Sequence, residues 1–197
     1  METLTVETYT FDELSDAAKR TAREHMRGIN VDSDFENVID EAKHIGEILG
    51  TDISNVLFSG FSSQGDGACF EGRYQYRKGS ERELREYAPV DEILHWIARN
   101  LFDVQRRNFY SLTAKIKHSG RYYHSRCTEI DVERSDGRKI TAETERMITE
   151  ILRSLIDWIY GVLDTERTYQ MTDTAFDEAI LANDYHFTAA GERKIYI

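Results

Sequence analysis

The chain has 197 residues, of which 40% are hydrophobic and 31% are charged, and its formal net charge is -11. This length and hydrophobic content are enough to bury a sizeable core as one domain. No apolar run approaches the roughly 20 residues that a bilayer span needs, and the N-terminal residues do not resemble a signal peptide. We therefore expect a cytoplasmic protein with no membrane partner.

The negative charge is distributed unevenly along the chain. The net charge is -8 over residues 1–60, +3 over residues 61–140 and -6 over residues 141–197. An acidic field disfavours nonspecific contact with nucleic acid and favours basic surfaces on other proteins, including surfaces that normally hold DNA or RNA. The alternative is that acidic helix faces only keep the protein in solution.

The N-terminal residues predict a strand followed by a helix. Alternation over Glu2–Tyr9 is typical of a strand. Thr10 and Glu13 then form a capping-box pattern, and apolar residues recur at helical spacing until Gly28.

The next helix has the cleanest amphipathic stripe in the sequence, and Gly50 should end it. Its apolar face consists of Phe35, Val38, Ile39, Ala42, Ile45 and Leu49. Carboxylates stand at its start and on its outer face, and they are Asp32, Asp34, Glu36, Asp40, Glu41 and Glu47. This helix is the most negative linear feature of the chain.

A hairpin is predicted over residues 56–76. Asp66-Gly67 is a dipeptide that favours the positive φ angles of a tight turn between antiparallel strands. In the second strand the apolar and aromatic residues fall on one side of the pleat, and they are Phe70, Gly72, Tyr74 and Tyr76. That side requires helices to cover it.

The rest of the chain alternates between helical and strand patterns. Pro89 separates a short helix that starts at Ser80 from a longer one that starts after Val90. Strands are predicted over residues 109–117 and 122–133. A long helix follows Thr141, a shorter one follows Thr172, and two short strands, over residues 186–188 and 194–197, end the chain.

The long helix has a wide apolar face, which implies burial on more than one side. Residues 141–163 therefore either lie centrally across the sheet or form a homodimer interface. The predicted fold class is α+β, with a mostly antiparallel sheet of hairpins and amphipathic helices packed on one face. We expect a single α+β domain over residues 1–197, with a possible C-terminal helical subdomain over residues 141–197.

The sequence predicts neither a catalytic residue nor a metal site. Cys69 and Cys127 form no CxxC pair, which argues against a structural zinc or a redox motif. His118 and His124 flank one turn, but a catalytic zinc needs three protein ligands and no carboxylate stands beside them. No serine lies in a nucleophile-elbow pattern. We therefore expect no enzymatic activity, no metal and no cofactor.

The hairpin loop has two interpretations. Its backbone N–H groups and hydroxyls resemble a nest for an anion, but Asp66 places a negative charge there and no phosphate-binding lysine follows. The favoured interpretation is a loop that shapes the hairpin and contacts a partner through Ser62, Ser63, Gln64 and Asp66.

Aromatic and basic residues interleave on the predicted strands, as in sheets that stack single-stranded nucleic acid. An antiparallel sheet also produces this pattern when its aromatics face the core and its Arg and Lys face water. We favour the second interpretation, because the acidic ends of the chain oppose nucleic acid, and expect no direct nucleic-acid partner.

Two stretches resemble a known group of proteins. One is Phe58-Ser59-Gly60-Phe61 with Ser63-Gln64-Gly65-Asp66-Gly67-Ala68 and Phe70, and the other runs from Tyr9 to Lys19. Together they resemble small proteins of bacteriophages and mobile elements, many of which are labelled as antitoxins of a toxin–antitoxin stability system. The resemblance covers about the first 75 residues and implies a phage or prophage product, in the host cell cytoplasm, that acts on a bacterial protein.

Charge and resemblance together lead to one main hypothesis. The chain is expected to be a noncatalytic phage-type inhibitor that binds a bacterial defence complex, such as a CRISPR effector or a restriction enzyme. Its acidic surface would block a nucleic-acid-binding site by means of salt bridges from the six carboxylates of the second helix. The alternatives are an antitoxin that neutralises a toxin protein, and a small-ligand-binding domain or enzyme that uses the loop over residues 62–67.

Overall fold

The computed structural model describes residues 7–28 and 35–194. Contacts between residues divide the chain into two compact units. Residues 35–164 make the larger unit, and the described residues on either side of it make the smaller one. Each unit has its own core. The expected single domain over residues 1–197 stays a prediction.

The larger unit contains a four-stranded antiparallel sheet in the order β2-β3-β4-β5. Its strands are β2 (Thr51–Ser59), β3 (Gly67–Gln75), β4 (Leu112–His118) and β5 (Thr128–Arg134). The strands follow each other in sequence order, so only short connections join β2 to β3 and β4 to β5. The pairing of β2 with β3 is irregular between Ile53 and Asn55.

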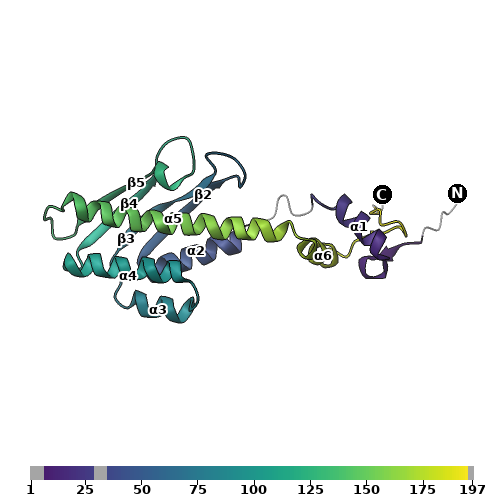
Figure 1. Cartoon of the computed structure of the whole chain (residues 1–197), viewed down its shortest axis with the longest axis horizontal. Helices are drawn as coiled ribbons and strands as arrows, with labels where there is room; N and C mark the ends of the chain where they lie inside the picture. Colours follow the sequence, from purple (N-terminus) through teal and green to yellow (C-terminus); the bar gives the residue numbers. More distant parts are fainter. Residues whose placement is uncertain (1–6, 29–34, 195–197) are drawn as a thin grey trace. The chain divides into compact units, whose positions relative to one another are not determined.

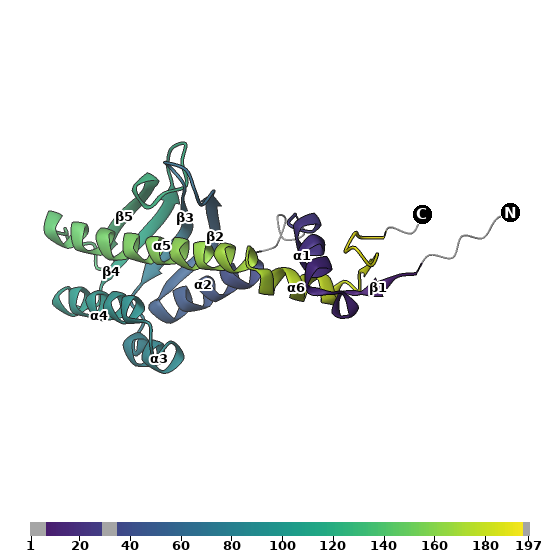
Figure 2. The same cartoon turned by 45° about the vertical axis from the view of Figure 1, so that its right-hand side comes forward.

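Helices cover one face of this sheet and leave the other face open, as Figure 1 and Figure 2 show. They are α2 (Glu36–Leu49), α3 (Ser80–Tyr87), α4 (Glu92–Arg107) and the first part of α5 (Ala142–Gln170). The buried core joins α2, α4 and α5 to the inner faces of all four strands. Ile148, Leu152 and Leu155 of α5 are completely buried. The wide apolar face of α5 is therefore explained by its position across the sheet.

Local sequence signals set the helix ends in this unit. Gly50 ends α2 with a left-handed φ of 81°, and the Asp91 carboxylate caps α4 by accepting the N–H of Leu94 at 2.9 Å. Thr141 accepts the N–H of Thr144 at the start of α5 at 3.2 Å. Pro89 lies between α3 and α4, where the chain changes direction.

A buried polar residue that the helical pattern did not reveal connects α4 to two strands. The Gln105 amide donates to the Leu112 carbonyl at 2.7 Å and to the Tyr74 hydroxyl at 3.1 Å. Its oxygen accepts the N–H of Leu112 at 3.1 Å. Gln105 is completely buried, so these bonds replace the water that its amide loses on folding.

The smaller unit is built from short elements. They are β1 (Tyr9–Thr10), the 3₁₀ turn η1 (Phe11–Glu13), α1 (Asp16–His25), the end of α5, α6 (Asp173–Ala182) and β6 (His186–Phe187). Strand β1 pairs with β6 in antiparallel fashion. Phe11 and Phe187 are buried in its core, and Arg23 of α1 holds Asp177 of α6 by two hydrogen bonds of 2.6 Å.

The α+β prediction is confirmed, but several boundaries were wrong. The Thr10–Glu13 capping box forms over η1, and α1 starts only at Asp16, with Ser15 as its cap. Residues 7 and 8 are not in a strand, and the rest of the predicted first strand before them lies outside the described residues, as do residues 195–197.

The strand predicted from residue 109 begins at Leu112, because Phe109 and Tyr110 adopt left-handed φ angles of 55° and 58°. The strand predicted from residue 122 begins at Thr128, after the 3₁₀ turn η2 (Ser125–Cys127). In both cases the polar and aromatic alternation extended beyond the hydrogen-bonded ladder.

The packing of β3 against β2 predicts that alanine substitutions at two glycines change the free energy of unfolding by very different amounts. A Cβ at Gly72 would lie in steric conflict with the Asp52 carbonyl oxygen, whereas a Cβ at Gly161 of α5 would meet nothing within 4 Å. We expect Gly72→Ala to lower the free energy of unfolding by about 2 kcal/mol or more. Gly161→Ala should leave it unchanged or raise it by up to about 1 kcal/mol, because alanine favours the helix. Urea denaturation measures both, and equal effects would contradict this packing.

Candidate protein-binding surface on α2 and the β2–β3 loop

Helix α2 presents carboxylates to solvent along the face opposite its core contacts. Ile45 and Leu49 are 2% exposed and fix the helix on the sheet. The predicted contact residues Glu36, Asp40, Glu41 and Glu47 are all exposed. Asp32 and Asp34, the other two predicted contacts, lie outside the described residues. We call the four described carboxylates the acidic face of α2.

The contacts that Asp40, Glu41 and Glu47 make within the protein neutralise these three carboxylates only weakly. Lys43, the one Lys or Arg in α2, lies 3.4 Å from Asp40, and the two side chains are 40% and 68% exposed. Exposed ion pairs of this kind contribute little, so a cation from a partner can replace Lys43. His44 lies 3.9 Å from Glu47 and pairs with it only when protonated.

Glu41 has a neutral partner. It accepts a hydrogen bond of 2.7 Å from the Tyr87 hydroxyl at the end of α3. This bond, followed by burial, raises the pKa of Tyr87. The His44 ring packs edge-on against Tyr87, with 4.8 Å between ring centroids. Glu41 is thus held in place by a partner that brings no positive charge.

The β2–β3 connection is a seven-residue loop over residues 60–66, and the predicted tight turn at Asp66-Gly67 is wrong. Gly60 and Gly65 adopt left-handed φ angles of 49° and 98°, whereas Gly67 already belongs to β3. The Asp66 carboxylate closes the loop by accepting the N–H groups of Ser62 at 2.8 Å and Ser63 at 2.6 Å.

This geometry decides between two uses of the loop. The backbone N–H groups that would hold an external anion already bind the carboxylate of Asp66. The loop shapes the hairpin, as the structural part of the favoured interpretation predicts, and its contact with a partner stays a prediction. Ser62, Ser63 and Gln64 are exposed, whereas Asp66 is only partly so.

An aromatic cluster brings the start of α2 and the base of this loop together. Phe35 lies 5.2 Å from Phe58 and 5.8 Å from Phe61, between ring centroids. Phe61 stacks on Tyr160 of α5 at 5.8 Å. These contacts place the Phe-Ser-Gly-Phe part of the motif beside the residue that precedes the acidic face.

Sequence reasoning missed Tyr160 and the carboxylates around it. The pKa of Tyr160 is raised first by burial and then by the nearby charges of Asp164 and Asp66. Acidic residues from α5 and from the loop thus gather next to the aromatic cluster. Asp66 and Asp164 come near each other only in the folded protein, since they are far apart in the sequence.

The other predicted features fall into structural roles. Cys69 is buried, and burial, together with the charge of Glu71 and proximity to Cys127, raises the pKa of its thiol to about 11, so it is a poor nucleophile. No group of three or more His, Cys, Asp and Glu side chains in the described ranges could hold a metal ion. None of the helices described combines the length and hydropathy that crossing a membrane requires.

Fold and surface together define a small α+β protein with a half-covered antiparallel sheet and an acidic helix at one side. The chain belongs to the DUF8835 family, described as a domain of unknown function, whose profile matches residues 18–173. The match includes the whole larger unit. Searches of curated proteins and of solved structures found no match to this chain.

The loop geometry predicts a structural role for Asp66 that its exposed neighbour lacks. Asp66→Ala leaves two backbone N–H groups without their charged acceptor, so the free energy of unfolding should fall by about 1–3 kcal/mol. Gln64→Ala serves as the control and should change it by no more than about 0.5 kcal/mol. Chemical denaturation and limited proteolysis of the loop measure the effect. Equal stability of the two variants would show that Asp66 does not close the loop.

Proposed function

We propose that this chain is a noncatalytic inhibitor that binds a basic, nucleic-acid-binding surface of a bacterial defence complex through the acidic face of α2. The observation that carries the proposal is the exposure of Glu36, Asp40, Glu41 and Glu47 on a helix fixed against the core. A rigid row of carboxylates loses little conformational entropy on binding a cationic cleft.

The spacing of the carboxylates supports one continuous contact. Asp40 lies four residues after Glu36, and Glu47 lies eleven residues after Glu36. All three therefore lie near one line along the helix. That line is about 16 Å long at 1.5 Å per residue. Such a row can pair with several Arg or Lys side chains that otherwise contact phosphates.

Charge also favours this kind of partner over nucleic acid itself. The net charge of -11 repels a polyanion and accelerates the approach of a cationic surface, with an effect that salt screens. Ser62 and Ser63 are exposed and follow Phe61, whose ring packs against Phe35, the residue before Glu36, so we expect them to supply uncharged contacts. The proposal places the protein in the cytoplasm of the bacterial host, where defence complexes act.

Charge reversal of the acidic face tests the proposal. The chain is expressed in cells that carry a restriction or CRISPR system, and phage plating efficiency and pull-down of the defence complex are measured. Wild-type protein should restore plating and capture the complex. Glu36→Lys, Asp40→Lys and Glu47→Lys combined should weaken capture about tenfold or more, because salt bridges become repulsion.

A second triple variant controls for the change in total charge. Glu86→Lys, Glu129→Lys and Asp157→Lys reverse three exposed carboxylates on α3, β5 and α5. This variant should inhibit as the wild type does, and both variants should remain folded by circular dichroism. Inhibition that survives reversal of the acidic face, or that fails equally in both variants, would refute the role of α2.

A further inference from the structure

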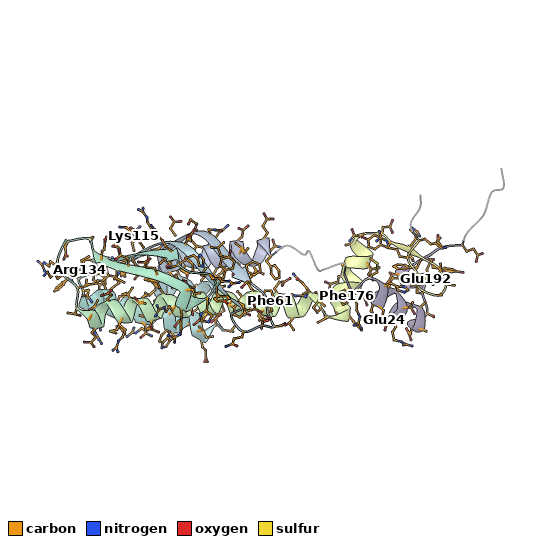
Figure 3. All side chains as sticks on the ribbon, turned by 90° about the horizontal axis from the view of Figure 1, so that it is seen from above. Glu24, Phe61, Lys115, Arg134, Phe176 and Glu192 are labelled. Carbon is orange, nitrogen blue, oxygen red and sulfur yellow. The ribbon has the colours of Figure 1, made fainter. Side chains whose placement is uncertain are left out.

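The open face of the sheet carries a groove that the acidic face of α2 does not explain. The groove has a volume of about 680 Å³ and runs over β3 and β4 beside the end of α2. Ligand pockets for small molecules have volumes of roughly 300–1,000 Å³. Figure 3 shows Lys115, which lines it, on the side of the sheet away from α5.

Two positive side chains stand side by side on adjacent strands in this groove. Arg73 of β3 and Lys115 of β4 are direct cross-strand partners, so their side chains leave the same face of the sheet. Like charges directly opposite each other destabilise a sheet. Asp52 on β2 and Asp131 on β5 are the other cross-strand partners of Arg73 and Lys115, so carboxylates flank the pair on its outer sides. No carboxylate of the described strands separates the two cations themselves, and a negatively charged ligand group between them would remove their repulsion.

Arg73 has no carboxylate within salt-bridge distance among the described residues. Lys115 lies 3.7 Å from Glu133 in an exposed pair, which stabilises little. The neighbouring Arg77, in contrast, is occupied, since it contacts Glu83 at 2.9 Å and the Glu47 carbonyl at 3.4 Å. The guanidinium of Arg73 is thus the group with unused hydrogen-bond donors in the groove.

The remaining walls of the groove add carboxylates, which can accept hydrogen bonds from the hydroxyl groups of a ligand. Asp52 stands directly opposite Arg73 on β2, and Glu47 and Glu133 also line the groove. Tyr76 also borders the groove, but its ring packs against Tyr110, 4.6 Å away between centroids, which in turn contacts Phe102 of α4.

We propose that this groove binds a small phosphate monoester with a hydroxylated carbon skeleton, of the sugar phosphate or nucleoside monophosphate kind. Its phosphate lies between Arg73 and Lys115, because an arginine fork and an ammonium group suit phosphate oxygens. Its hydroxyls face Asp52 and Glu133. A polynucleotide fits less well, because phosphates on either side would meet the carboxylates of the walls.

Titration calorimetry with the full chain tests this site. AMP and ribose 5-phosphate should both bind, whereas adenosine, which lacks the phosphate, should not. Tighter binding of AMP than of ribose 5-phosphate indicates that the base contributes, and equal binding indicates that the sugar phosphate suffices. Inorganic phosphate should bind more weakly than either, since it makes no contact with the walls.

Substitutions separate the site from general electrostatics. Arg73→Gln and Lys115→Gln should each weaken AMP binding about tenfold or more. Lys117→Gln removes a lysine on the same strand and face but outside the groove, and should have little effect. Arg73→Gln removes one like-charge pair, with Lys115, and one opposite-charge pair, with Asp52, so its free energy of unfolding should stay close to that of the wild type. Chemical denaturation that confirms this excludes misfolding as the cause of lost binding.

Three results would overturn the proposal. One is the absence of binding of both phosphate esters at millimolar concentration, and another is equal weakening by Lys117→Gln. The third is tighter binding of a single-stranded oligonucleotide than of AMP, which would make the groove part of a nucleic-acid surface. Arg73 and Lys115 lie outside the acidic face of α2, so failure here leaves the proposed inhibitor function intact.

Discussion

The half-covered sheet is the constraint on which the larger unit depends. Its inner face is apolar on all four strands, and α2, α4 and α5 bury it. Apolar contact alone does not select one orientation of α4 on the sheet. The three hydrogen bonds of Gln105 to β3 and β4 fix where α4 lies. Burial supplies most of the stabilisation, and the buried amide selects one arrangement of helix and strands.

Covering one face determines what the protein can present to its surroundings. The outer face of α2 is free to carry carboxylates because its inner face anchors the helix. The open side of the sheet is free to carry Arg73 and Lys115 for the same reason, since residues that alternate along a strand face opposite sides. The two proposed binding surfaces share one core and meet at Glu47, but the groove adds the cations Arg73 and Lys115, which the acidic face lacks.

The residues that resemble a phage-protein signature have a structural explanation. Gly60 and Gly65 adopt left-handed conformations, Asp66 closes the loop, and Phe58 and Phe61 join the loop to α2 and α5. These residues are required by backbone geometry and packing, so the motif identifies a loop shape. Any partner contact of the loop involves its exposed serines and glutamine.

The sequence by itself determined the fold class, most helix ends and the acidic helix, because these depend on local periodicity, capping residues and charge. Gly50, Thr141 and Thr172 act at the helix ends where the pattern placed them, whereas the cap of α4 at Asp91 was seen only in the structure. Only the tertiary structure decided which residues from distant segments meet. Strand register and helix packing place Arg73 opposite Lys115, bury Gln105 and stack Phe61 on Tyr160. One amino-acid sequence read alone carries no signal for these contacts.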